Sequence, residues 1–144
     1  MPNLRNYHIF ISHAWKYGDE YNRLVNMLNT APYFSYYNYS APREKPLHNL
    51  DATDVTTKSQ IKAAIDRKIA PSNCVLVISG MYTVHREWMQ YEIDTAVRMR
   101  KPIIAVRPWG SQVMPISIVS VATEIVGWNT SSIIDAIRRN SRYN

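Results

Sequence analysis

A continuous apolar run at 74–78 (CVLVI) is the feature that most constrains what this chain can fold into. Five consecutive apolar side chains suit a central strand covered on both faces, as the strands of parallel sheets are. Similar runs at 7–12 (YHIFIS) and 102–106 (PIIAV) alternate with segments of helical periodicity, such as 21–28. This alternation is typical of an α/β protein with a parallel sheet.

The whole chain, 1–144, is expected to form one domain, because 144 residues suit a single core. We predict a flavodoxin-like, doubly wound parallel sheet of five strands in the order 2-1-3-4-5. The expected strands are 7–12, 34–39, 74–78, 102–106 and 124–126, and the expected helices are about 21–28, 54–69, 84–100 and 131–139. A long loop at 40–53 and an irregular segment at 108–122 complete the chain. In this strand order, ligands bind beyond the carboxyl ends of strands 1 and 3, which points to the loops at 12–15 and 79–82.

Several kinds of site are excluded by residues that are missing. The four glycines are isolated from one another, so neither a dinucleotide fingerprint nor a phosphate-binding P-loop occurs. Four scattered histidines and one cysteine, Cys74 in an apolar strand, predict no metal site and no disulfide framework. No apolar stretch is long enough to span a membrane, and the N-terminus lacks a signal-peptide core, so we expect a cytoplasmic protein.

The net charge of +6 favours phosphate-bearing partners, which include dinucleotides and nucleic acids. The positive charge is dispersed along the sequence and does not alternate with aromatic residues as in a base-stacking surface, so nucleic acid is not an expected partner. We interpret the basic residues as a solvated face. The two densest clusters are Arg98, Arg100, Lys101 and Arg107, and then Arg138, Arg139 and Arg142.

The helix expected at 84–100 carries three acids, which separate when residues are placed at 100° per position. Glu92 falls roughly 40° from Trp88 and away from the other two acids. A carboxylate in such an aromatic sector is costly unless something binds it, although a partly exposed glutamate bonded to a loop is an equally good interpretation. The polar face would hold Glu87, Gln90, Asp94 and Arg98, and the core face Met89, Ile93 and Val97.

The aromatic and histidine neighbours allow structural interpretations as well. Trp88 suits a core or groove-covering position, and Trp15 either covers a core edge or stacks on a base. His13 and His85 are expected to be ordinary surface or crevice histidines rather than catalytic bases.

Two segments resemble the TIR domain family. The opening YHIFISHAWK (7–16) is similar to the first strand and following loop of these domains, and 74–108 is similar to their strand C, helix C and strand D. Trp88 and Glu92 match the W-x-x-x-E motif of TIR domains that cleave NAD. The resemblance extends to the TIR-like proteins of the bacterial Thoeris anti-phage defence.

The resemblance implies a TIR-like fold and an enzyme of NAD glycohydrolase or ADP-ribosyl cyclase type. It would use NAD as substrate rather than cofactor, cleave the nicotinamide–ribose bond and make a cyclic ADP-ribose-type signal for a separate NAD-consuming effector. Glu92 would be catalytic, and the loop at 40–53 would correspond to the loop that mediates self-assembly into a homo-oligomer. The implied substrate-binding residues are Phe10, Ser12, His13, Trp15, Ser79, Tyr82 and Trp88.

The chain departs from the family pattern at three places. His13 stands where tyrosine is usual, Met89 replaces the common cysteine, and the loop at 40–53 contains no glycine. Two rival functions therefore remain at the level of the sequence. The first is a non-enzymatic TIR-like interaction module, and the second, suggested by the basic charge, is a nucleic-acid binder.

Overall fold

The protein is represented by a computed structural model that describes residues 5–12, 20–40, 55–79, 86–107 and 114–142, and the findings below concern these residues. Ten helices and strands lie in this part of the chain, with bounds within two residues of those predicted wherever both exist. In order they are β1 (Asn6–Ser12), α1 (Glu20–Thr30), β2 (Ser35–Asn38), α2 (Val55–Ile69), β3 (Cys74–Ile78), α3 (Arg86–Arg98), β4 (Ile103–Arg107), α4 (Ile116–Val119), β5 (Glu124–Gly127) and α5 (Thr130–Asn140).

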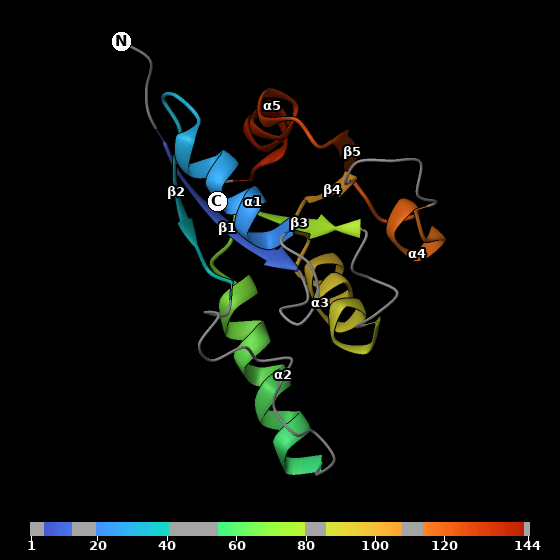
Figure 1. The fold of residues 1–144 in the computed structure, drawn as a ribbon. Helices are drawn as coiled ribbons and strands as arrows, with labels where there is room; N and C mark the ends of the chain where they lie inside the picture. The colour runs from blue at the N-terminus through green and yellow to red at the C-terminus, as the bar shows by residue number, and fades with distance from the viewer. Residues whose placement is uncertain (1–4, 13–19, 41–54, 80–85, 108–113, 143–144) are drawn as a thin grey trace.

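The five strands form one parallel sheet in the order β2-β1-β3-β4-β5, which confirms the predicted fold class and strand order. Ile9 of β1 lies beside Cys74 of β3, and Val75 lies beside Ile103 of β4. Helices α2 and α3 pack together on one face of the sheet, and α1 and α5 pack together on the other (Figure 1). The carboxyl ends of β1 and β3 are therefore adjacent, at the point where the strand order reverses.

The core follows from the apolar periods of the sequence. All five side chains of β3 are buried, as expected of a strand covered on both faces. On α2, the side chains of Ile61, Ile65 and Ile69 recur every four residues and are buried against the sheet. The edge strand β2 is mostly exposed, which explains why its sequence is less apolar.

One prediction of a core residue, Val97, is wrong. Val97 of α3 is 48% exposed, because the buried face of the helix is rotated toward the row formed by Trp88, Glu92 and Ala96. The amphipathic pattern placed the core about a quarter-turn too far round, since it counted Glu92 as a polar residue outside the core. The irregular segment expected at 108–122 contains a four-residue helix, α4, whose Ile118 is buried.

Asn73 joins the amino ends of β1 and β3 to the segment after α5. Its side-chain oxygen accepts a 2.8 Å hydrogen bond from the His8 backbone N–H, and its side-chain amide donates to the Arg142 carbonyl at 2.9 Å. The Arg142 backbone N–H donates in return to the Asn73 carbonyl at 3.1 Å. These bonds close the end of the sheet opposite the predicted site.

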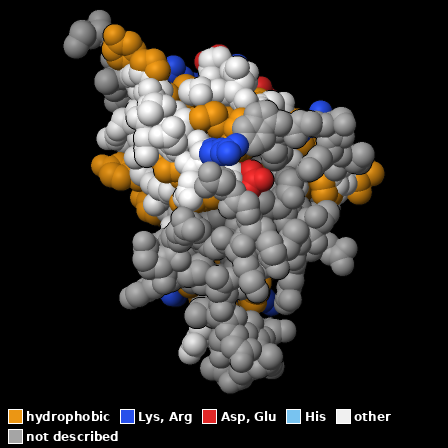
Figure 2. Space-filling model, in the orientation of Figure 1, with side chains coloured by type: hydrophobic (Ala, Val, Ile, Leu, Met, Phe, Trp, Pro, Cys, Tyr) orange, Lys and Arg blue, Asp and Glu red, His pale blue; other side chains and the backbone are white. Residues whose placement is uncertain are grey.

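Hydrophobic side chains reach the surface at two edges of the molecule, beside β2 and around α4 (Figure 2). At the α4 edge, Ile116 is 83% exposed and Val119 is 45% exposed. Among the helices that the structure describes, none has the length and apolar character needed to cross a membrane.

Candidate functional site

A buried hydrogen bond joins Ser12, the last residue of β1, to Glu92 in the middle of α3. The Ser12 hydroxyl donates to Glu92 Oε1 at 2.7 Å. Ser12 is completely buried and Glu92 is only 2% exposed. The fold thus brings the predicted catalytic acid to the carboxyl end of β1, across 80 residues of sequence.

Glu92 lies within the buried face of α3 rather than at its border. Trp88, one turn earlier, is 8% exposed, and Ala96, one turn later, is fully buried. Removing a carboxylate from water is costly unless hydrogen bonds compensate, so a carboxylate here weakens the core relative to an apolar side chain. The position therefore calls for an explanation beyond stability.

Asp66 of α2 holds α3 in place. Its Oδ1 accepts hydrogen bonds from the Tyr91 hydroxyl at 2.9 Å, the Thr95 hydroxyl at 3.4 Å and the Arg98 guanidinium at 3.2 Å. These three donors occupy successive turns of α3, on both sides of Glu92. One acid on α2 therefore fixes the position and rotation of the helix that carries the candidate catalytic group.

Ser40 holds the end of β1 from the other side. Its buried hydroxyl accepts from the Ile11 backbone N–H at 2.8 Å, immediately before Ser12. The Asn38 amide nearby donates to the Tyr21 hydroxyl at 2.8 Å. Burial raises the pKa of Tyr21 above its ordinary value, so the phenol stays protonated at neutral pH.

The other described residues of the predicted site are placed as follows. Phe10 is 2% exposed and lies in the hydrophobic core, on the same side of β1 as Ser12. Ser79 is buried after β3, and its hydroxyl donates to the Val106 carbonyl of β4 at 3.2 Å. Trp88 packs in the core, which agrees with its structural interpretation and leaves its role in substrate binding a prediction. Three further predicted contacts, His13, Trp15 and Tyr82, lie outside the described residues, as does His85.

In the part of the chain that the structure describes, Cys74 and the metal-ligating residue types provide no rival site. Burial raises the pKa of the Cys74 thiol to about 12, and the Ser141 hydroxyl offsets this only partly, so the thiol stays protonated at neutral pH. Within the described ranges, no three His, Cys, Asp or Glu side chains are grouped to hold a metal ion.

Two supporting residues escaped sequence reasoning. Asp66 and Ser40 act on partners that are distant in sequence, 25 or more residues away for each bond described above. No local motif marks either residue. The signal that could have found Asp66 is its place on α2 between two apolar positions, Ile65 and Ile69, where a partly buried acid is within reach of donors from a neighbouring element.

The arrangement suits the stabilisation of positive charge. A carboxylate in a desolvated site, held by a donor from a rigid strand, interacts strongly with a cation that forms next to it. The carboxyl end of β1 beside β3 is also where ligands bind in sheets of this order.

Comparison with known families agrees with this geometry. No curated protein matches the sequence. A family model described as "Thoeris protein ThsB, TIR-like domain" matches residues 10–113, which include both Ser12 and Glu92. This match covers well over half of the chain. The chain therefore belongs to the TIR-like domain family of the Thoeris protein ThsB.

Proposed function

We propose that this protein is an NAD-processing enzyme of bacterial anti-phage defence that cleaves the nicotinamide–ribose bond. The observation that carries the proposal is the buried 2.7 Å hydrogen bond from Ser12 to Glu92 at the carboxyl end of β1. Family membership supports it, because the W-x-x-x-E motif of NAD-cleaving TIR domains falls on Trp88 and Glu92. The product would be a cyclic ADP-ribose-type signal that activates a separate effector.

The chemistry requires one well-placed carboxylate. When the bond breaks, its electron pair stays with the nicotinamide nitrogen, so nicotinamide leaves as a neutral molecule and needs no general acid. The ribose becomes an oxocarbenium-like cation, as in glycoside cleavage. Glu92 stabilises this cation until a nucleophile bonds to the anomeric carbon. Capture by the substrate's own adenine or a ribose hydroxyl gives a cyclic product, and capture by water gives a linear one.

Ser12 is a positioning residue in this scheme. Its hydroxyl is carried by the rigid central strand and bonds one carboxylate oxygen of Glu92. The bond restricts the Glu92 rotamer, so that the negative charge is already oriented when the cation forms.

Access is the second requirement. Because Glu92 exposes only 2% of its surface, NAD reaches the carboxylate only after an opening step. An enzyme built in this way is inactive until it opens, which suits a signal that must be made only during infection.

The test follows nicotinamide release and ADP-ribose-type products by mass spectrometry, with purified protein alone and with extract of phage-infected cells. Wild-type protein is compared with Glu92→Gln, which keeps the side-chain shape and an oxygen that can accept from Ser12. The matched control is Asp94→Asn, an exposed acid on the same helix. We expect Glu92→Gln to lose turnover and Asp94→Asn to keep it. Equal turnover by wild type and Glu92→Gln would refute the proposal.

The rival function, a non-enzymatic interaction module, is favoured by one observation. Ile116 and Val119 expose an apolar surface on α4. This function predicts that wild-type protein releases no nicotinamide under either condition and that Ile116→Asp abolishes its biological effect. Turnover that Ile116→Asp leaves intact favours the enzyme.

A further inference from the structure

Basic residues at the carboxyl ends of two helices, α3 and α5, lie at the same end of the molecule. In a parallel α/β fold, helices run back toward the amino ends of the strands, so the carboxyl ends of α3 and α5 lie at the same edge. Arg100 and Lys101 follow α3, and Arg139 and Arg142 lie at and beyond the end of α5. Two clusters that are some 40 residues apart in the sequence are therefore neighbours. Arg107 is separated from them, because it lies at the carboxyl end of β4.

These residues line an open cleft of about 660 Å³ beside the first residues of β4. Its basic side chains are Arg100, Lys101, Arg139 and Arg142, and its apolar floor includes Ile103 and Val121. No acidic residue is among the described residues that line it. The volume is within the ordinary range of small-molecule sites, about 300–1,000 Å³.

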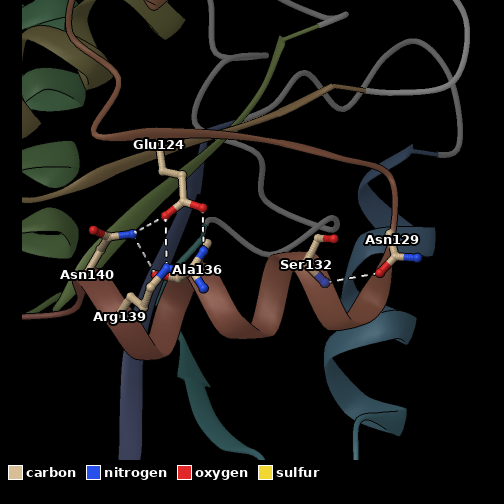
Figure 3. Close-up of polar contacts among 6 residues, drawn as sticks. All are labelled: Glu124, Asn129, Ser132, Ala136, Arg139 and Asn140. Atoms are coloured by element: carbon tan, nitrogen blue, oxygen red, sulfur yellow. Dashed lines mark hydrogen bonds and ion pairs between the residues drawn. The ribbon is translucent and has the colours of Figure 1, made fainter.

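The four cations differ in how far their charge is already balanced. Figure 3 shows Glu124 of β5 above the end of α5, where its carboxylate binds the Arg139 guanidinium and accepts a 2.9 Å hydrogen bond from the Asn140 amide. Lys101 donates to the neutral Ala70 carbonyl at 2.8 Å, which leaves its charge uncompensated. Arg100 and Arg142 form no ion pair with any acid of the described residues. Among the described residues, one of the four cations is thus paired with an acid and three are not.

Arg100 is also in a conformation that disfavours its side chain. Its φ is 58°, which lies in the left-handed region, and a residue that takes this conformation directly after a helix is usually glycine. Neutralisation of the helix dipole explains Arg98 in the last turn of α3, but it does not explain a strained arginine two residues later. A side chain kept where glycine is preferred indicates that the guanidinium has a task.

We propose that this cleft binds a small oligophosphate, at the end of the sheet opposite Glu92. Three of its cations have no acidic partner among the described residues, and together they exceed the charge of about −1.5 to −2 on a single phosphate group, so a ligand with more than one phosphate matches them best. Guanidinium groups bind phosphate oxygens through paired hydrogen bonds, and the apolar floor accommodates a non-polar part of the ligand. The site goes beyond the proposed reaction, because none of its residues contacts Ser12 or Glu92.

The test is isothermal titration calorimetry with inorganic pyrophosphate and, separately, with ADP. Arg100→Gly removes the guanidinium while placing the residue that the backbone prefers, so we expect this variant to fold as wild type does. We expect this variant and Arg142→Gln each to weaken binding about tenfold. Arg67→Gln, an exposed arginine at the end of α2 outside the cleft, is the matched control and should bind as wild type does.

Three outcomes would overturn the proposal. Wild-type protein that binds neither anion refutes it, and so does equal weakening by Arg67→Gln, which would indicate only the general positive field. The third is a single-stranded oligonucleotide that binds through Arg100 and Arg142 while pyrophosphate does not, since the surface would then recognise nucleic acid. Glu92→Gln should retain pyrophosphate binding, so failure of the proposed reaction and failure of this site are distinguishable.

Discussion

The acids at the two ends of the sheet differ in their burial and in their hydrogen-bond partners. At the carboxyl end, Glu92 is buried and accepts from the neutral hydroxyl of Ser12. At the amino end, Glu124 is partly exposed and is bound by the cationic Arg139 and by Asn140. Hydrogen bonds from Arg139 and Asn140 lower the pKa of Glu124 below its ordinary value. The contrast separates an acid that ties β5 to α5 from a buried acid at the end of the sheet where ligands bind in this strand order.

The largest effect should come from Glu92→Gln. Removing a preorganised charge from a reacting centre commonly costs about 10²–10³ in turnover, and we expect a fall of that size in kcat for nicotinamide release. Glu124→Gln, the same substitution at the other end, should leave kcat unchanged. If kcat fell equally in both variants, the distinction between the two acids would be lost.

Ser12→Ala should come next, with kcat lowered about tenfold or more. The alanine removes the donor that orients Glu92 but no group that binds substrate, so KM should stay near the wild-type value. Steady-state kinetics of NAD cleavage separate the two parameters. A rise in KM with constant kcat would instead make Ser12 a substrate contact.

Asp66→Ala tests the hydrogen bonds by which α2 holds α3, the helix that carries Glu92 and ends beside the basic cleft. Loss of an acceptor for three donors should lower the free energy of unfolding by about 1–2 kcal/mol. Urea denaturation followed by circular dichroism measures this. Asp94→Ala on the exposed face of α3 is the control, and an equal loss there would show that Asp66 has no special role.

Arg100→Gly should change stability in the opposite direction. A non-glycine residue in the left-handed region costs about 1–2 kcal/mol, so glycine at this position should stabilise the fold by about that amount. The loss of a positive charge at the end of the helix should offset about 0.3–1 kcal/mol of this gain. We expect a small net rise in Tm, of the order of 2–4 °C. A clear fall in Tm would mean that the Arg100 side chain stabilises the fold rather than serving a ligand.

Glu124→Gln should have the smallest effect, below about 1 kcal/mol at about pH 7, because the ion pair with Arg139 is partly exposed to solvent, which screens it. The folded-state pKa of Glu124 is lowered, so its contribution is present above the ordinary carboxyl pKa and disappears as pH falls through the lowered value. Urea unfolding of both proteins at several pH values from about 7 down to about 3 should show the difference shrink as the pH falls below the ordinary carboxyl pKa. A difference that stays constant over this range would contradict the role of the charge.

Much of the fold could be predicted because its apolar periods are local. The run at 74–78 and the four-residue spacing of Ile61, Ile65 and Ile69 indicate strand and helix directly. Val97 could not be placed correctly, because a buried glutamate rotates the helix in a way that hydrophobicity does not encode.

The site was only partly predictable, for a related reason. Glu92 stood out by motif and by its place on the helix, but its bond to Ser12 spans 80 residues and depends on the sheet order. The basic cleft escaped notice because its arginines are separated in sequence. Only the parallel topology, which returns every helix to the same edge, brings Arg100 and Arg142 together.

The pairing of β1 has a consequence for how the chain is synthesised. β1 is the first strand of this sheet to be made, yet its Ile9 must wait for Cys74, 65 residues later, before one of its edges is covered. At about 5–20 residues per second, translation alone takes roughly 3–13 s to produce that partner. During this interval an apolar strand with open hydrogen-bonding groups is exposed on the nascent chain. We expect the yield of native protein to depend on chaperones that act on the ribosome, more than the small size of the chain would suggest.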